Sequence, residues 1–163
     1  MKTVRDTLHL LLDSAVTKGA SYAPAAADFH LDRYTELVVT LAITSAERDS
    51  ANETYDFYLI TGDGLSEWDV VHFPQIATTG AKTFTARVSS LLLPQNVTTA
   101  APGVTAVDSG TLATVSGGTN APKSLAAGSV RHGPFGNMLR YELVCAGTIV
   151  TGIAYSIQVQ ARG

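Results

Sequence analysis

The sequence has a single cysteine and few charged residues, and both shortages narrow the possible functions. Cys145 cannot form a disulfide within the chain, and no Cys-X-X-Cys pair is present to bind a metal. Charged residues make up 15% of the 163 positions, whereas about a quarter is usual. The 11 Lys and Arg residues are scattered and the net charge is −3. Because no basic patch is visible, we predict no nucleic-acid partner.

Long apolar runs are missing as well. No stretch approaches the roughly 18 consecutive apolar residues that suggest a transmembrane helix, so we predict no membrane association. The N-terminal stretch is only superficially like a signal peptide, because Asp6, His9 and Asp13 interrupt its apolar part. We therefore expect the chain to be made in, and to stay in, the cytosol. Cys145 lies in an apolar, strand-like run, which predicts a buried and unreactive thiol.

The sequence also lacks the common catalytic motifs. It contains no P-loop, no G-x-S-x-G, no H-E-x-x-H and no dinucleotide-binding fingerprint. The four histidines are His9, His30, His72 and His132. No two of them have the spacing of metal ligands, and the His-x-His of a metal-binding jelly roll is absent. We expect His132, in a Gly- and Pro-rich turn, to form hydrogen bonds rather than to act as a base. These absences predict a protein that is not an enzyme and that uses no cofactor or metal.

Acidic residues are concentrated in residues 54–73, and two interpretations are open. The carboxylates of Asp63, Glu67 and Asp69 could supply oxygen ligands to a cation, although the pattern of a dedicated calcium loop is missing. Alternatively, Gly62-Asp63-Gly64 is a tight turn in which Asp63 stabilises the backbone. The second interpretation is favoured, and it places the carboxylates on a solvent-facing or subunit-facing edge.

The N-terminal residues favour a helix or an extended arm. Their apolar side chains recur at helical spacing, at Val4, Leu8, Leu11, Leu12 and Ala15. This pattern predicts a short amphipathic helix, although an arm that docks on a neighbouring subunit fits the same residues. Pro24 marks a linker after it. We thus expect an arm or helix with a linker over residues 1–30 and one folded domain over residues 31–163.

From Tyr34 onward the apolar residues alternate with period two, as in strands. The alternation covers residues 34–44, 53–61, 68–73 and 82–88, and a closing hairpin spans residues 137–163. Residues 94–129 differ, because they are rich in Thr, Ala, Gly, Ser and Pro and contain no aromatic residue. We expect this segment to be an insertion that protrudes or contacts a neighbour, with short strands at 104–107 and 111–115. The whole pattern predicts an all-β sandwich or barrel.

The order of these segments resembles the jelly-roll cement or decoration proteins of tailed bacteriophage capsids. The resemblance is carried by "TLHLLLDSAVT", "YTELVVTLAIT", "ETYDFYLITGDGLSEWDVVHFPQI", "GAKTFTARV" and "LRYELVCAGTIVTGIAYSIQVQAR". It covers most of the chain except residues 94–129. It implies a jelly-roll-like antiparallel β-sandwich without an active site. It also implies a virion protein that forms a homotrimer on the outer capsid surface and bridges neighbouring major capsid proteins.

The residues that would form such an interface are expected on the arm and in two turns. We predict the arm side chains to reach a neighbouring subunit, and the turns at Trp68 and "RHGPFG" to contact a trimer partner or the shell; the candidates are Val4, Leu8, Leu11, Leu12, Trp68, His132 and Phe135. An alternative function is a carbohydrate-binding module in a phage receptor-binding or tail assembly. Its sugar-stacking platform would be formed by aromatic side chains, namely Tyr55, Tyr58, Trp68, Phe73 and Phe84.

Overall fold

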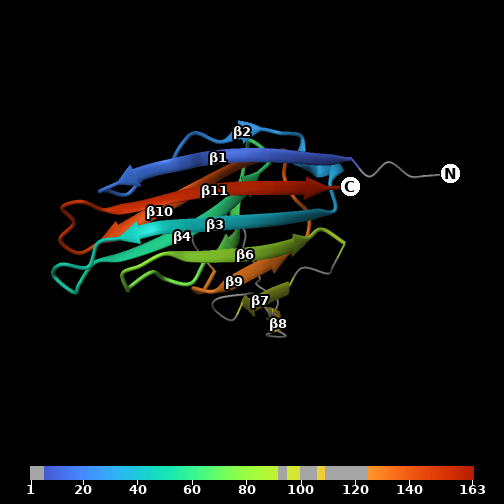
Figure 1. Ribbon diagram of the computed structural model, residues 1–163. Coiled ribbons are helices and arrows are strands. Elements are labelled where there is room, and N and C mark those ends of the chain that lie inside the picture. The colour runs from blue at the N-terminus through green and yellow to red at the C-terminus, as the bar shows by residue number, and fades with distance from the viewer. Residues whose placement is uncertain (1–5, 92–94, 100–105, 109–124) are drawn as a thin grey trace.

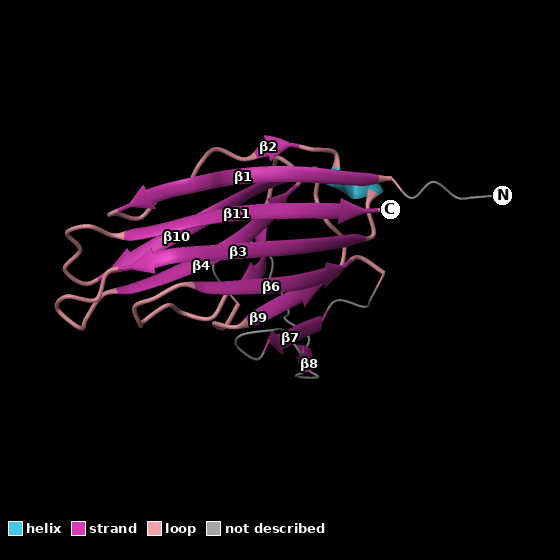
Figure 2. Ribbon diagram, in the orientation of Figure 1, coloured by secondary structure: helices cyan, strands magenta, loops and turns pink. Residues whose placement is uncertain are grey.

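The computed structural model describes residues 6–91, 95–99, 106–108 and 125–163, and in these residues the chain forms two antiparallel sheets (Figures 1 and 2). The first sheet contains, in spatial order, β1 (Thr7–Lys18), β11 (Ile153–Arg162), β3 (Glu36–Ala46) and β6 (Lys82–Ser89). The second contains, in spatial order, β2 (Ala27–Asp28), β10 (Met138–Ala146), β4 (Thr54–Gly62), β5 (Glu67–His72), β9 (Ser129–His132), β7 (Gln95–Thr99) and β8 (Ala106–Asp108). A short 3-10 helix, η1 (Leu31–Arg33), precedes β3. The predicted all-β fold is confirmed.

The strand order is that of a jelly roll. Strands β7, β8 and β9 all lie between β6 and β10 in the chain, and they extend the second sheet beyond β5. When the remaining strands are numbered consecutively, the two sheets read 1-8-3-6 and 2-7-4-5, which is the arrangement of the eight-stranded jelly roll. The jelly-roll-like sandwich predicted from the sequence is therefore present, and three short strands have been added to one of its sheets.

The core lies between the two sheets and is formed by every second residue of the long strands. On β3 the buried side chains are Leu37, Val39, Leu41 and Ile43, and on β11 they are Ile153, Tyr155, Ile157 and Val159. These are the inward-facing residues that the alternation predicts. The facing strands of the second sheet contribute Tyr55, Phe57, Leu59, Leu139, Tyr141 and Leu143.

The N-terminal segment is a strand, so the predicted helix is wrong. Strand β1 pairs with β11 from Thr7 through Lys18, and β-bulges interrupt the register on both sides of Asp13. The leucines fit both periods, because Leu8, Leu10 and Leu12 alternate as in a strand while Leu8, Leu11 and Leu12 have helical spacing. Pairing with β11 selects the strand over the helix, since the backbone groups of β11 that face away from β3 need hydrogen-bond partners. The segment is extended, as an arm would be, but it pairs within its own chain.

The domain begins earlier than residue 31. Residues 20–30 also belong to the sandwich, because Tyr22 exchanges backbone hydrogen bonds of 2.9 and 2.8 Å with Leu143 and β2 pairs with the start of β10. Of the insertion expected at 94–129, the structure shows β7 paired with both β8 and β9. The strand expected at 104–107 overlaps β8, whereas the one expected at 111–115 lies outside the described residues.

The loops at one end of the sandwich are joined by a single carboxylate. Glu47, which follows β3, accepts hydrogen bonds from the N–H groups of Val150 at 2.9 Å and Gly152 at 2.5 Å, and also from Thr151. Gly152 has a φ of +90°, and a Cβ atom placed there would lie 2.1 Å from the carbonyl oxygen of Lys18. The β10–β11 turn is thus fixed against the end of β3 and the end of β1.

Candidate interface on the β1 sheet

The outer face of the β1 sheet is broad and carries few charges. The alternate residues of β3 that point away from the core are only partly buried, and they include Val38, Thr40 and Ala42. Neighbouring strands add Gln158 and Gln160 from β11 and small polar residues from β6. This composition follows from the sequence, since Thr and Val suit a pleated strand and the chain has few charged residues to place on it.

A shallow groove of about 340 Å³ runs across this face where β1 meets β11 and β3. Its outer-facing lining residues are His9, Leu11, Val38, Thr40, Gln158 and Gln160. The side-chain amide of Gln160 lies 3.3 Å from Nε2 of His9, so the groove wall is tied across the two strands. The side chains here can offer neutral hydrogen bonds and apolar contact, which are the interactions that dominate protein–protein interfaces away from their rims.

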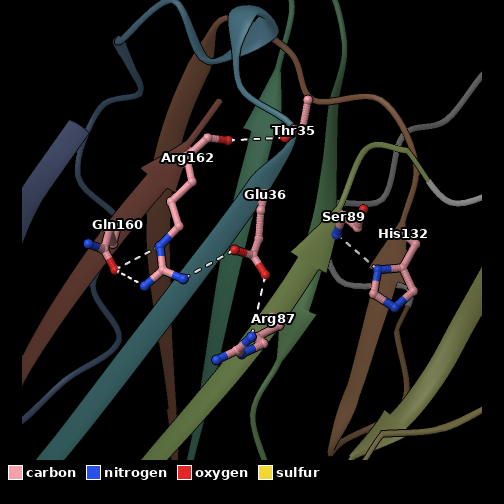
Figure 3. Close-up of polar contacts among 7 residues, drawn as sticks. All are labelled: Thr35, Glu36, Arg87, Ser89, His132, Gln160 and Arg162. Carbon is pink, nitrogen blue, oxygen red and sulfur yellow. Dashed lines mark hydrogen bonds and ion pairs between the residues drawn. The ribbon is translucent and has the colours of Figure 1, made fainter. Parts of the chain in front are cut away.

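Charges gather at one end of the face, where the C-terminal part of β11 lies beside the start of β3 (Figure 3). Glu36 lies between two guanidinium groups, 3.4 Å from that of Arg162 and 3.6 Å from that of Arg87. The Arg162 guanidinium also donates a 3.1 Å hydrogen bond to the side-chain oxygen of Gln160, and the hydroxyl of Thr35 donates to the Arg162 carbonyl. Arg87 and Arg162 are exposed enough for water to screen these pairs, so we expect them to contribute little to stability.

Strand β1 supplies the edge of this sheet. Leu11 points outward from it and is 64% exposed, and it lies between the 340 Å³ groove and a second groove of about 170 Å³. The second groove is lined mainly by apolar residues from β1 and the segment around β2, including Leu12, Pro24 and Phe29, and β10 adds Arg140 and Tyr141. An exposed leucine between two grooves is the kind of anchor that a partner's surface could enclose.

The predicted interface residues of the N-terminal segment differ in their exposure. Leu11 is on the surface, in the position just described. Leu8 and Leu12 point inward and pack, partly buried, against the core. Val4 lies outside the described residues. Of the three leucines, Leu11 is therefore the one that points outward as expected.

The predictions for the two turns are corrected by burial. Phe135 is a core residue at 6% exposure, and Trp68 packs partly buried against the same core from β5. His132 is 7% exposed and its Nδ1 accepts a 3.0 Å hydrogen bond from the backbone N–H of Ser89, as Figure 3 shows. It thus forms hydrogen bonds, as predicted, but it joins β9 to β6 instead of facing a partner.

The aromatic platform required by the carbohydrate-binding alternative is not formed. Tyr55, Phe73 and Phe84 belong to the core. Tyr58 stacks on the His72 ring with centroids 4.0 Å apart, and both side chains are buried. Trp68, the fifth ring, packs against the core.

The acidic cluster is a set of internal contacts. The Asp63 carboxylate accepts the N–H groups of Leu65 at 2.9 Å and Ser66 at 2.8 Å, and these two bonds lower its pKa. This is the turn geometry that the second interpretation predicted. Glu67 accepts 3.1 and 2.7 Å hydrogen bonds from Arg140.

Of the carboxylates that we expected on an edge, Asp69 is buried and Asp56 is partly buried, because each has a partner on the outer face of the second sheet. Asp69 is fully buried, 3.1 Å from the Arg131 guanidinium, and accepts the N–H of Leu125 at 2.6 Å. Asp56 lies 3.0 Å from Nε2 of His72. Burial by itself would raise the pKa of Asp56, but hydrogen bonds from His72 and the Gln75 amide outweigh it and lower the pKa.

These pairs were hard to predict, since the partners are remote from one another in the chain. The one hint is that Asp69 and His72 lie in a strand whose apolar residues do not alternate cleanly, because a register shift falls between them. The second ring nitrogen of His72, Nδ1, lies 2.8 Å from the Leu125 carbonyl. Leu125 is thus held by Asp69 through its N–H and by His72 through its carbonyl.

The Cys145 thiol, which we predicted to be buried, is partly buried against the core. Burial raises the pKa of the Cys145 thiol to about 11, so that the thiol stays protonated near neutral pH and is a poor nucleophile. Across the described parts of the chain, no group of three or more His, Cys, Asp or Glu side chains could hold a metal ion. The same residues contain no helix long and apolar enough to cross a membrane.

Comparisons of the chain with protein-family models, with curated proteins and with solved structures find no match. Conclusions about function therefore depend on the sequence and on the arrangement of its side chains.

Proposed function

We propose that this protein is a structural component of a tailed-phage virion, which binds the outer capsid surface as a homotrimer and cements neighbouring major capsid proteins. The observation that carries the proposal is the outer face of the β1 sheet. It is wide, nearly uncharged and lined by Thr, Gln, Val and Leu side chains around a 340 Å³ groove. Such a face suits recognition by area and neutral hydrogen bonds.

The rest of the molecule supports a role in binding. The acidic residues that suggested a catalytic or cation site are paired with Arg131, Arg140, His72 or backbone N–H groups. The jelly-roll order of the strands agrees with the resemblance to capsid cement proteins. That resemblance implies a homotrimer. Threefold symmetry would give the trimer three anchors on the shell, one from each protomer, so weak single contacts would add up to firm attachment.

The test is to mix the purified protein with expanded, DNA-free heads of the phage whose genome encodes it, and to measure co-sedimentation. We expect saturable binding by a species whose mass by light scattering is that of a trimer. Because the face is nearly uncharged, binding should persist when the salt concentration is raised from about 0.1 M to about 1 M, where exposed charge pairs are screened. A monomer that does not sediment with the heads would contradict the proposal.

A salt-dependent loss of binding would instead assign attachment to the charged end of the face. Arg87→Ala is the variant that separates these outcomes, because its side chain is 67% exposed and its ion pair with Glu36 spans 3.6 Å. We expect this variant to bind heads as the unmodified protein does. A large loss of binding in Arg87→Ala would refute the assignment to the uncharged face.

A further inference from the structure

One side of strand β1 is an open sheet edge. The strand is at the end of its sheet and pairs with β11, and none of the described strands pairs with its other side. The N–H of Gly163 donates to the carbonyl of Asp6 at 2.9 Å, which shows that Asp6 directs its carbonyl toward β11. In an antiparallel pair, every second residue directs its N–H and C=O groups toward the partner strand, and the residues between direct theirs away from it. The register is unbroken from Thr7 to Leu11, so the residues that direct their backbone groups outward are Thr7, His9 and Leu11.

The first half of this edge has none of the usual protection against pairing with another strand. Residues 7–11, "TLHLL", contain no proline, no lysine and no acidic residue, and their register with β11 is unbroken. The second half is protected, because the register shifts on both sides of Asp13, Ala15 has a φ of +51° and Lys18 carries a charge. A strand could therefore be added along residues 7–11 but would be turned away beyond them.

The sandwich is also open beneath this edge. Leu8, Leu10 and Leu12 point toward the core but stay only partly buried. The reason is the brevity of β2, which has two residues and cannot cover the inner face of a 12-residue strand. The apolar 170 Å³ groove lies on this side, next to Leu12 and Phe29. An added strand would place alternate side chains over these leucines and bury them further.

We propose that the occupant of this edge is β1 of a second copy of the chain, paired antiparallel about a twofold axis at Leu10. In this register Leu10 faces its own equivalent and His9 faces Leu11 of the other copy. Leu8 lies opposite Leu12, the residue at which the β1–β11 register shifts, so regular pairing ends there on each side. The outward-directed backbone groups of His9 and Leu11 meet one another, as the hydrogen-bonding parity requires.

The edge favours a second copy because it is complementary to itself. The same three leucines supply both halves of the apolar contact, and the neutral stretch ends at Asp13 on each side. A twofold contact of this kind is isologous and would continue the β1 sheet across two molecules. It does not depend on capsid binding, and it is compatible with a trimer, since it would join one trimer to another. An edge of about five residues is shorter than a standard interface, so the association should be weak and dependent on concentration.

The first experiment compares two Leu→Lys variants by sedimentation velocity over a wide concentration range. Leu11→Lys places a charge on the edge, whereas Leu65→Lys, at a turn residue that is 96% exposed, is the matched control. For the unmodified protein, the smallest species should double in mass as concentration rises. We expect Leu11→Lys to raise the dissociation constant of this step at least about tenfold. No doubling in the unmodified protein, or equal weakening by both variants, would overturn the proposal.

The second experiment tests the register by disulfide trapping in a Cys145→Ser background. Leu10 would form a non-hydrogen-bonded pair with its equivalent, with Cα atoms about 4.5 Å apart, which is within the range that a disulfide spans. Leu10→Cys should therefore cross-link on oxidation. His9→Cys and Leu11→Cys would form a hydrogen-bonded pair with Cα atoms about 5.5 Å apart, so they should cross-link when mixed and not when oxidised separately. Circular dichroism of each variant verifies the fold, and cross-linking that ignores this pattern would contradict the twofold pairing.

Discussion

The ion pair between Asp69 and Arg131 gives a quantitative test of how the second sheet is closed on its outer face. Asp69 is fully buried on β5, and its carboxylate lies 3.1 Å from the Arg131 guanidinium on β9. The other carboxylate oxygen accepts the N–H of Leu125 at 2.6 Å. Replacing Asp69 by Ala removes both contacts and leaves the Arg131 charge, whose side chain is 9% exposed, without this carboxylate.

The expected cost follows from the geometry. At 3.1 Å and an effective dielectric constant of about 20, the Coulomb attraction is about 5 kcal/mol. Much of it offsets the desolvation of the two charges, but removing one partner exposes that desolvation cost fully. Breaking a buried pair in this way typically costs about 3–5 kcal/mol. For a domain of this size, that corresponds to a fall in melting temperature of about 6–20 °C.

The assay is unfolding by urea and by heat, followed by circular dichroism, for Asp69→Ala and a control. Asp49→Ala is a suitable control because Asp49 is exposed in the loop after β3, where such changes usually cost less than about 0.5 kcal/mol. The double variant Asp69→Leu with Arg131→Met should recover part of the loss, since an apolar pair needs no charge compensation. It should stay about 1–3 kcal/mol below the unmodified protein, because the Leu125 N–H still lacks its acceptor. Asp69→Ala with the stability of the control would refute this reasoning.

Two further predictions concern the loops at the far end of the sandwich. The hydrogen bond from the N–H of Gly152 outweighs the effect of burial and helps to lower the pKa of Glu47 below its usual 4.5. The stability that this carboxylate contributes should be present above pH 4.5 and lost as the pH falls through the lowered pKa. Glu47→Gln should therefore flatten the dependence of the urea midpoint on pH below pH 4.5, and an unchanged slope would contradict this prediction. Gly152→Ala should lower the melting temperature far more than Gly80→Ala. Both glycines have a positive φ, but of the two only Gly152 has backbone in the way of a Cβ atom, which would lie 2.1 Å from the carbonyl oxygen of Lys18. Equal effects of the two substitutions would show that this close approach is unimportant.

The sequence was most informative where burial alone decides the structure. The alternation of Leu37, Val39, Leu41 and Ile43 located β3 and its inward face, because a one-residue slip would have exposed all four side chains. The turn at Asp63 was also predictable, since the hydrogen bonds of its carboxylate are made within three residues. Local chemistry and simple periodicity were sufficient in both places.

The errors arose where distant partners decide the outcome. Residues 7–12 fit a helix and a strand equally well, and pairing with β11, at the other end of the chain, selected the strand. The carboxylate of Asp69 looked like a surface group until its partners, Arg131 and Leu125, were brought to it by the fold. Phe135 looked like an exposed turn residue for the same reason, and it is buried in the core. A contact between residues more than fifty positions apart leaves no trace in local periodicity.

The correction to the N-terminal segment changes how the interface must be tested. If residues 1–20 formed a separate arm, their removal would detach the protein from its shell and leave the sandwich folded. Because β1 is a strand of the sandwich that contributes Leu8, Leu10 and Leu12 to the packing, the deletion should instead destabilise the whole domain. Point changes at exposed positions such as Leu11 are therefore the informative variants.

The most direct test of the central claim is an electron cryo-microscopy reconstruction of expanded, DNA-free heads saturated with the protein. The account predicts one trimeric density at the threefold or quasi-threefold positions of the outer surface, in contact with neighbouring capsid subunits. It further predicts that the outer face of the β1 sheet, around the groove between His9, Thr40 and Gln158, lies against protein. Heads without added density, or trimers whose β1 sheets face solvent over their whole width, would contradict it.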